Sequence, residues 1–233
     1  MTLTLVLAES SIELVPYEIA GHPSVVAAAR RKKRNPRRLT LDQTYHHEAI
    51  LKLPEHGVGR GRPDIVHSCL LLALASPLNM EGELQCFVHT RDDHVITVQA
   101  NARLPRNSQR FVSLLEQLYE KSRVPPTGPA LMSIERLSLK RLLEKTAHNP
   151  VIALTTQGVK LSMEDVARKA ALSRNPAILI GGFSYGHFSQ KTLQLAHDKY
   201  RIDSRSLEAS TVVSRALYDY EKAIELRRYV SEN

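Results

Sequence analysis

The sequence predicts an α/β protein whose mostly parallel sheet is flanked by helices. Two segments, 149–158 (NPVIALTTQG) and 175–186 (NPAILIGGFSYG), are apolar without polar alternation, which is typical of strands buried on both faces. Amphipathic helix patterns follow them at 162–172 and 206–230. Because buried strands alternate with helices, a parallel sheet covered on both sides is expected.

The first half of the chain adds further elements. β-Forming runs predict strands at 2–8 (TLTLVLA), 84–90 and 94–100, the last two joined by a tight RDD connection. Apolar periodicity predicts helices at 63–76, ended by Pro77, and at 108–121. Residues 24–39 begin with helix formers, and VPPTGP at 124–129 is a short linker signal.

Helix signals in the second half are more specific. Ser162 and Asp165 have the spacing of a capping box at the start of the 162–172 helix. The helix at 206–230 carries apolar residues at 209, 212, 213, 216, 217, 220, 223 and 224. No internal repeat is visible, so residues 1–233 are predicted to form a single α/β domain with one inserted or appended subregion.

The composition is that of a globular protein with a basic surface. The net charge is +8 and the pI is near 9.6, which favours polyanions such as RNA or DNA, or an anionic membrane surface. Cys69 and Cys86 stand in apolar contexts, without the spacing of a zinc site, and are expected to be reduced core residues. The first ten residues lack a signal-peptide pattern and the most apolar window is too short to span a bilayer, so a soluble, intracellular protein is expected.

Two clusters of basic residues are candidate phosphate contacts. Seven of the nine residues from Arg30 to Arg38 are basic, a run that suits a phosphate-binding arm, a nuclear-localisation-like segment or a solvated face. Arg103, Arg106 and Arg110 precede or open the helix at 108–121, where cations oppose the helix dipole. An anion shared by these arginines and the helix N–H groups would offset that cost, whereas the alternative is three ordinary surface arginines.

The segment GVGRGRPD, at 57–64, is explained only in part by local rules. Pro63 suits the first position of a helix, and Asp64 complements the positive end of the helix dipole. Those rules require neither the arginines at 60 and 62 nor the glycines at 59 and 61. A glycine loop at 181–186 follows a buried strand and is either a ligand-binding loop or a tight turn. The histidines show no metal-binding arrangement, so no metal is assigned.

Several segments together resemble one family, the nucleolar-essential-protein methyltransferases that modify N1 of pseudouridine in small-subunit ribosomal RNA. They are LDQTYHHEAI (41–50), GRPDIVHSCLLLALASPLN (61–79), VHTRDD (88–93), RLPRNSQRF (103–111), IGGFSYG (180–186) and SLEASTVVSRALYDYE (206–221). The resemblance spans nearly the whole chain, and the compact N-terminus is more similar to archaeal members. This family belongs to the knotted SPOUT superfamily.

The resemblance implies S-adenosylmethionine as methyl donor, held by a deep C-terminal trefoil knot at about 150–230. Three segments would form its pocket: the strand end at Leu154 and Thr155, the glycine loop, and the segment from Ile202 to Ala209. The cofactor-binding residues implied are Leu154, Thr155, Gly181, Gly182, Gly186, Ile202, Asp203, Ser204, Arg205, Ser206, Leu207 and Ala209. Two departures from the family pattern are Tyr185, where histidine is usual, and RSLEA at 205–209.

The resemblance also implies an RNA site. Arg62 and Asp64 would face the RNA and its target base, Arg103, Arg106 and Arg110 would grip phosphates, and a basic insertion at about 22–60 would add RNA contacts. Asp64 would orient the flipped base in preference to acting as general base, since a carboxylate is a poor match for so weak an acid. Small-subunit rRNA, a second copy of the chain and ribosomal assembly proteins are the implied partners.

Three functional hypotheses follow. The first is a cytoplasmic RNA methyltransferase, nucleolar if the source is a eukaryote. The second is a non-catalytic RNA-binding factor in ribosome assembly. The third is an α/β enzyme of another kind whose basic surface is incidental. Binding of S-adenosylmethionine separates the first from the second.

Overall fold

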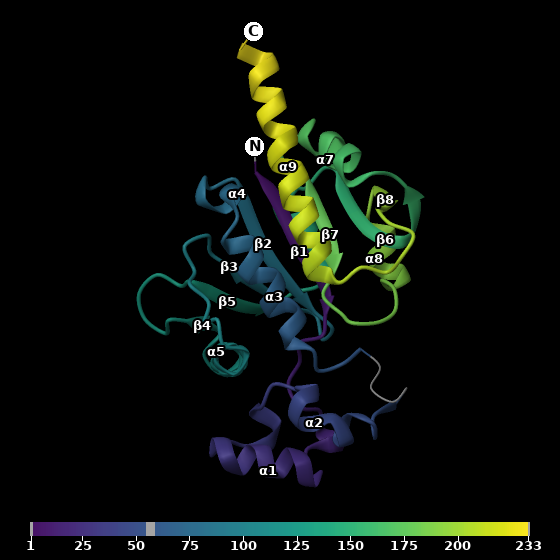
Figure 1. Ribbon diagram of the computed structural model, residues 1–233. Helices are drawn as coiled ribbons and strands as arrows, with labels where there is room; N and C mark the ends of the chain where they lie inside the picture. Colours follow the sequence, from purple (N-terminus) through teal and green to yellow (C-terminus); the bar gives the residue numbers. More distant parts are fainter. Residues whose placement is uncertain (1, 55–58, 233) are drawn as a thin grey trace.

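A computed structural model describes residues 2–54 and 59–232 (Figure 1). Its eight-stranded sheet has the order β4-β5-β3-β2-β1-β7-β6-β8. The strands are β1 (Leu3–Ser10), β2 (Leu84–Thr90), β3 (His94–Val98), β4 (Arg123–Val124), β5 (Met132–Arg136), β6 (Val151–Lys160), β7 (Ala177–Gly181) and β8 (Asp198–Arg201). The run from β2 through β1, β7 and β6 to β8 is parallel, whereas β3, β5 and β4 pair antiparallel.

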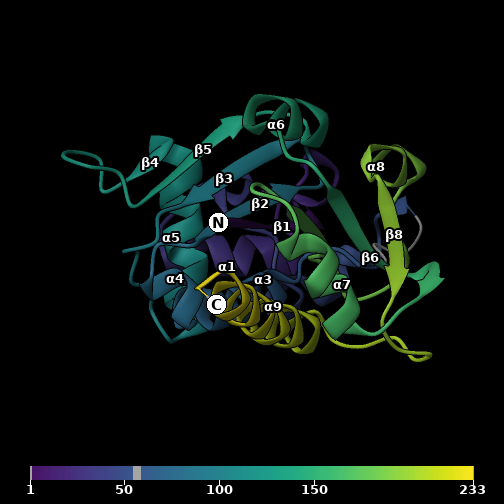
Figure 2. The same ribbon diagram turned by 90° about the horizontal axis from the view of Figure 1, so that it is seen from above.

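Helices cover both faces of the sheet. They are α1 (Pro23–Lys32), α2 (Gln43–Ile50), α3 (Pro63–Leu74), α4 (Pro77–Met80), α5 (Ser108–Lys121), α6 (Leu139–Thr146), α7 (Met163–Ala171), α8 (Gln190–Leu195) and α9 (Ala209–Glu232), with short 3₁₀ helices at Tyr17–Ile19 and Pro36–Arg38. Figure 2 shows α6 and α8 on one side of the sheet and α3, α7 and α9 on the other. The predicted α/β sheet with flanking helices is therefore confirmed, with an antiparallel edge added.

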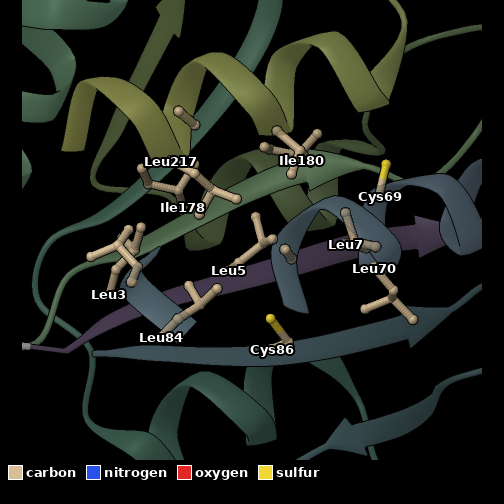
Figure 3. Packing of buried hydrophobic residues seen from close by; sticks show 14 of the residues in the cluster. Leu3, Leu5, Leu7, Cys69, Leu70, Leu84, Cys86, Ile178, Ile180 and Leu217 are labelled. Carbon is tan, nitrogen blue, oxygen red and sulfur yellow. The ribbon is translucent and has the colours of Figure 1, made fainter. Parts of the chain in front are cut away.

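β1 is the central strand, and both of its faces are buried. Leu3, Leu5 and Leu7 point into the larger core with α3 and α9, while Val6 and Ala8 join the smaller core under α6 and α8. Figure 3 shows the larger core, in which the β1 leucines contact side chains of β2, β7, α3 and α9. Cys69 and Cys86 lie in this core as free thiols, as predicted, and burial raises the pKa of both to about 12.

The predicted helix starts are confirmed where a capping pattern was visible. Ser162 Oγ caps α7 by accepting the N–H of Asp165 at 3.1 Å, and it donates to the Asp165 carboxylate at 2.5 Å, so the two residues expected at the helix start do pair there. In α9 the predicted apolar positions are buried or half-buried against α3 and α7. Several elements were not predicted: α2, α4, α6, α8, and the strands β4, β5 and β8. Most of these are short, so they carry little periodic signal.

α1 and α2 form a small separate unit below the sheet (Figure 1), with its own core of Val25, Leu39 and Ile50. This unit is held to α5 by charge. Glu116, buried on α5, accepts a hydrogen bond from Lys32 Nζ at 2.6 Å, and its second oxygen lies 3.8 Å from Arg34 Nε. The unit covers most of the predicted basic insertion at 22–60, of which residues 55–58 lie outside the described part.

No helix within the described residues is both long enough and apolar enough to cross a membrane.

Replacing Glu116 by glutamine is expected to lower the free energy of unfolding by about 1–3 kcal/mol, because a buried acceptor for two cations loses its charge. Urea unfolding of the variant measures this loss. Glu144→Gln, an exposed acceptor of surface ion pairs on α6, is the control and is expected to change stability by less than about 0.5 kcal/mol. Equal stability of the two variants would contradict the role given to Glu116.

Candidate functional site

A cavity of about 390 Å³ opens at the carboxyl end of β7 and beside the middle of β6. Three of its walls come from residues 154–156 of β6, from Ile180, Gly181 and residues 183–188 at the end of β7 and after it, and from residues between 200 and 212 that lead from β8 into α9. The chain order reverses here, because β7 lies between β1 and β6 while the next strand, β8, lies beyond β6. Ligands of open α/β sheets bind at such reversals, outside the carboxyl ends of the strands.

Every cofactor-binding residue implied by the resemblance lines this cavity, except two. Those that do are Leu154, Thr155, Gly181, Gly186, Ile202, Asp203, Arg205, Ser206, Leu207 and Ala209. Gly182 and Ser204 do not line it, and their predicted cofactor contacts stay predictions. Sequence reasoning missed Thr156, Phe183, His187 and Tyr200, which also line the cavity and stand beside predicted residues.

Gly182 has a structural role that excludes any side chain. A Cβ atom at this position would lie 2.1 Å from Ser10 Oγ and 2.9 Å from Ser10 Cα. Its backbone N–H donates to Ala8 O at 3.0 Å and its carbonyl accepts from the Ser11 N–H at 2.9 Å. Gly182 therefore joins the end of β7 to the end of β1, immediately behind the cavity wall.

Gly186 provides open backbone at the cavity. Its φ is +98°, a conformation that favours glycine, and no atom lies within 4 Å of a Cβ placed there. Thr156 Oγ1 lies 3.3 Å from His187 Nδ1, which links the β6 wall to the glycine loop. The neighbouring Tyr185 side chain lines the cavity and is 76% exposed, so it lies at the cavity's mouth.

Asp203 is the acidic group of the third wall. Its carboxylate accepts a hydrogen bond from Arg205 Nε at 3.1 Å and lies 3.8 Å from Arg215 Nη1. Hydrogen bonds from Arg205 lower the pKa of Asp203 to about 2, so the carboxylate is ionised at neutral pH. The cavity thus combines apolar walls, ionised and hydroxyl side chains, and exposed backbone.

The first turn of α3 forms the fourth wall and brings Arg62 and Asp64 to the cavity. The Arg62 guanidinium donates to both oxygens of Asp64, at 2.9 and 2.8 Å, and this pairing raises the pKa of Arg62. Arg62 N–H donates to Ser11 O at 3.1 Å, so the same serine that binds Gly182 also fixes Arg62. The structure therefore brings the predicted base-proximal pair to the same cavity as the segments predicted to bind the cofactor.

Arg60 and Gly61, which belong to the same segment, serve the fold. Arg60 donates to Glu13 through two nitrogens and so anchors the segment to the chain after β1. Gly61 has a φ of +65°, and a Cβ there would lie 3.0–3.2 Å from Ile50, Gln43 and Leu41. These contacts within the chain account for the glycine at 61.

Arg103, Arg106 and Arg110 lie outside the cavity, on an exposed loop and the first turn of α5. This loop contacts α3 through Pro105, whose carbonyl lies 2.7 Å from His67 Nε2. Asn107 Oδ1 caps α5 by accepting the Arg110 N–H at 3.1 Å, so that N–H is already paired. None of the three arginines forms an ion pair with a described residue, which leaves their charges available to an anion.

The basic run at 30–38 is largely paired within the protein. Lys32, Arg34 and Arg38 form ion pairs with Glu116 or Glu120 of α5. The guanidinium groups of Arg31 and Arg37 lie over the rings of Tyr45 and Tyr17, at 5.1 and 5.5 Å from the ring centroids. The basic run therefore holds α1 against α5. Sequence reasoning missed this role, because the acidic partners of the run lie some 80 residues further along the chain.

No group of three or more His, Cys, Asp or Glu side chains within the described ranges could hold a metal ion.

Comparison with known proteins gives consistent results. The model of the EMG1/NEP1 methyltransferase family matches residues 5–221. The "Ribosomal RNA small subunit methyltransferase Nep1" of Thermococcus kodakarensis is 42% identical, over 96% of this chain and 100% of that protein, and the Pyrococcus furiosus protein of the same description is 40% identical over 94% and 96%. The crystal structure of Archaeoglobus fulgidus Nep1 bound to S-adenosylhomocysteine is 33% identical, with a TM-score of 0.85 over 97% of this chain and 100% of that one.

Gly182→Ala is expected to destabilise the protein by about 1–3 kcal/mol, because the new methyl group overlaps Ser10. Thermal unfolding followed by circular dichroism measures the change. Gly21→Ala is the matched control, since nothing lies within 4 Å of a Cβ there. A Gly182→Ala protein as stable as the control would refute the contact assigned to Ser10.

Proposed function

Because the chain belongs to the EMG1/NEP1 methyltransferase family, we propose that it transfers the methyl group of S-adenosylmethionine to N1 of a pseudouridine in small-subunit ribosomal RNA. The observation that carries this proposal is a single cavity lined both by the predicted cofactor segments and by Arg62 and Asp64. A methyl donor and an RNA base can therefore meet at one place.

The cavity's residues fit S-adenosylmethionine. Leu154, Ile202 and Leu207 offer apolar surface for the adenine, and the Asp203 carboxylate and the Ser206 hydroxyl can pair with its polar groups. Gly186 leaves backbone exposed for a close approach. When bound, the cofactor supplies an electrophilic methyl group, and the protein's task is to orient and desolvate the acceptor.

Arg62 and Asp64 orient the base in this proposal. With both carboxylate oxygens already accepting hydrogen bonds from Arg62, Asp64 is held in one position at the cavity wall. Its remaining lone pairs can accept an N–H of the pseudouridine ring and so turn N1 toward the methyl group. A carboxylate is a weak base for such an N–H, so orientation is its main contribution. N1 would bond to the methyl carbon as the carbon–sulfur bond breaks, S-adenosylhomocysteine would leave with that electron pair, and the N1 proton would pass to water.

The exposed arginines bind the RNA backbone. The loop that carries these arginines, Arg103, Arg106 and Arg110, contacts α3, and Arg62 stands immediately before α3. Phosphates bound by the arginines therefore belong to the RNA strand that delivers the target base. The target base must leave its stack to enter the cavity, which suits a single-stranded loop. Small-subunit rRNA is thus the substrate, and ribosomal assembly proteins are further partners at the same stage.

The remaining family features are part of the proposal. The three cavity walls from residues 150–230 form the deep trefoil knot, and α9 contributes to a homodimer. Domain limits follow as a single domain, 1–233, with the RNA-binding insertion at about 22–60. Because the ribosomal small subunit is assembled there, the proposed location is the cytoplasm, or the nucleolus if the source is a eukaryote.

Ser206→Trp is expected to reduce S-adenosylmethionine affinity by about 100-fold or more, because an indole fills the cavity that the cofactor needs. Isothermal titration of the folded protein gives the affinity. Ser113→Trp is the control: Ser113 is also exposed but lies on α5 and does not line this cavity, so cofactor affinity should stay within about threefold of the original. No binding by the unaltered protein would exclude the methyltransferase and favour a non-catalytic RNA-binding factor.

Arg106→Glu is expected to weaken RNA binding by about tenfold or more at moderate salt and to flatten its salt dependence, because a phosphate contact becomes a repulsion. Cofactor affinity should be unchanged. Arg174→Glu makes the same charge change before β7, at the end of the strand opposite the cavity, and serves as control. Equal RNA binding by the two variants would remove Arg106 from the RNA site.

A further inference from the structure

A second cavity, of about 230 Å³, lies between α1, α2 and α5, apart from the cofactor cavity. Buried apolar side chains of Ala28, Leu39 and Val112 line it from within. Exposed polar residues, including Arg31 and Gln109, line it toward the solvent. An apolar interior with a polar rim is the arrangement of small-ligand sites.

Two buried groups beside this cavity lack hydrogen-bond partners. The His46 ring accepts the Asp42 N–H at Nδ1, at 3.1 Å, which leaves Nε2 to carry the ring proton. Neither His46 Nε2 nor Thr40 Oγ1 has a hydrogen-bond partner among the described residues, although both residues are at least 98% buried. Buried polar atoms are normally paired, so two unpaired groups lining one cavity point to an acceptor supplied by a ligand.

The surroundings of the cavity indicate which ligand it takes. The Arg31 guanidinium lies over the Tyr45 ring at the cavity, 5.1 Å from its centroid, and offers a flat cationic surface. Guanidinium planes and aromatic rings are the surfaces on which unstacked RNA bases pack. Arg30 and Lys33, at the end of α1, have no ion-pair partner within the described ranges, so the neighbourhood is positively charged.

The position of α2 connects this cavity with the RNA site already described. Gln43, the first residue of α2, donates its N–H to Gly61 O at 2.8 Å, next to Arg62. At the other side Tyr45 accepts a hydrogen bond from Gln109, which adjoins Arg110. The second cavity therefore lies along α2, between Arg62 at the cofactor cavity and Arg110 of α5.

We propose that this cavity binds a second unstacked base of the RNA substrate, one that flanks the target nucleotide. The inference rests on the proposed function, because it requires RNA as the substrate. Ala28, Leu39 and Val112 receive the ring, Arg31 covers it, and a carbonyl oxygen of the base accepts hydrogen bonds from His46 and Thr40. Two bases held at separate sites fix the register of the loop, so the cavity contributes to the choice of target.

Thr40→Val tests the inference, because it removes a hydroxyl while keeping the shape of the side chain. In the free protein, removing an unpaired buried hydroxyl should raise the Tm. Because the same hydroxyl would contact the RNA base, its removal should also weaken RNA binding about three- to tenfold. Thr4→Val is the matched control: Thr4 Oγ1 is also buried without a described partner, but it lies in β1, far from the cavity. That control should raise the Tm and leave RNA binding unchanged.

Ser113→Trp provides a second variant that does not disturb the core, since Ser113 is exposed at the cavity's rim. An indole there should block the cavity and weaken RNA binding about tenfold or more. The probe is a hairpin RNA with pseudouridine in a single-stranded loop, titrated without cofactor at two salt concentrations. Because no charge is removed, both variants should keep the salt dependence of the original protein.

The outcomes separate this inference from the proposed function. The original protein is expected to bind both the hairpin and S-adenosylmethionine. If it does, and if Thr40→Val and Ser113→Trp bind the hairpin as tightly as the original, the second base site is wrong and the proposed methyltransferase function is unaffected. If the original protein binds no RNA, both fail. Weaker RNA binding by both variants, with Thr4→Val unchanged, supports the site.

Discussion

Gly182, Ser11 and Arg62 are joined by a chain of backbone hydrogen bonds, in which Ser11 N–H donates to Gly182 O at 2.9 Å and Ser11 O accepts from Arg62 N–H at 3.1 Å. This chain continues the parallel pairing of β1 with β7, which in the sheet order of the described residues is the only pairing between the strands before residue 137 and those after residue 150. It places the residue that begins α3 beside the loop that follows β7. The cavity exists because these two segments are held together.

Charge has two separate uses in this protein. One group of cations, including Lys32, Arg34 and Arg60, pairs with Glu116, Glu120 or Glu13 and holds the small helical unit and its connection to the sheet. A second group, Arg103, Arg106 and Arg110, remains exposed on one loop and one helix turn. Because several cations near α1 are paired with glutamates, that region is less basic than the net charge of +8 suggests. The cations that can still bind an anion are instead concentrated near α3.

Local sequence patterns predicted the elements with strong signals. The Ser162 cap of α7, the apolar periodicity of α9 and the buried character of β7 were all visible, and the structure confirms them. The predicted burial of β6 is confirmed only for residues 151–154, because its remaining residues are half-buried or exposed. Short elements such as β8 and α8 were missed because four to six residues show no period. The partners of Lys32 and Arg60 could not be found either, since contacts 84 and 47 residues away depend on the completed fold.

For the site, the segments named from the resemblance supply most of the cavity lining, whereas Gly182 and Ser204 are not part of it. Gly182 follows a cavity residue yet faces Ser10 on β1, and only the three-dimensional pairing reveals this. The arginine–aspartate pair at the start of α3 was identified correctly as a unit, and the structure adds its geometry and its bond to Ser11. The second cavity had no signal in the sequence, because its residues come from three helices and from the segment 39–42 between two of them.

Methyl transfer to a defined RNA tests the central claim most directly. Two hairpins of the same sequence, one with pseudouridine and one with uridine at a single loop position, are incubated with the protein and S-adenosylmethionine, and the mass of each digested nucleoside is measured. The account predicts one added methyl group, located on N1, in the pseudouridine hairpin alone. Methylation of both hairpins, or at an atom other than N1, would contradict it.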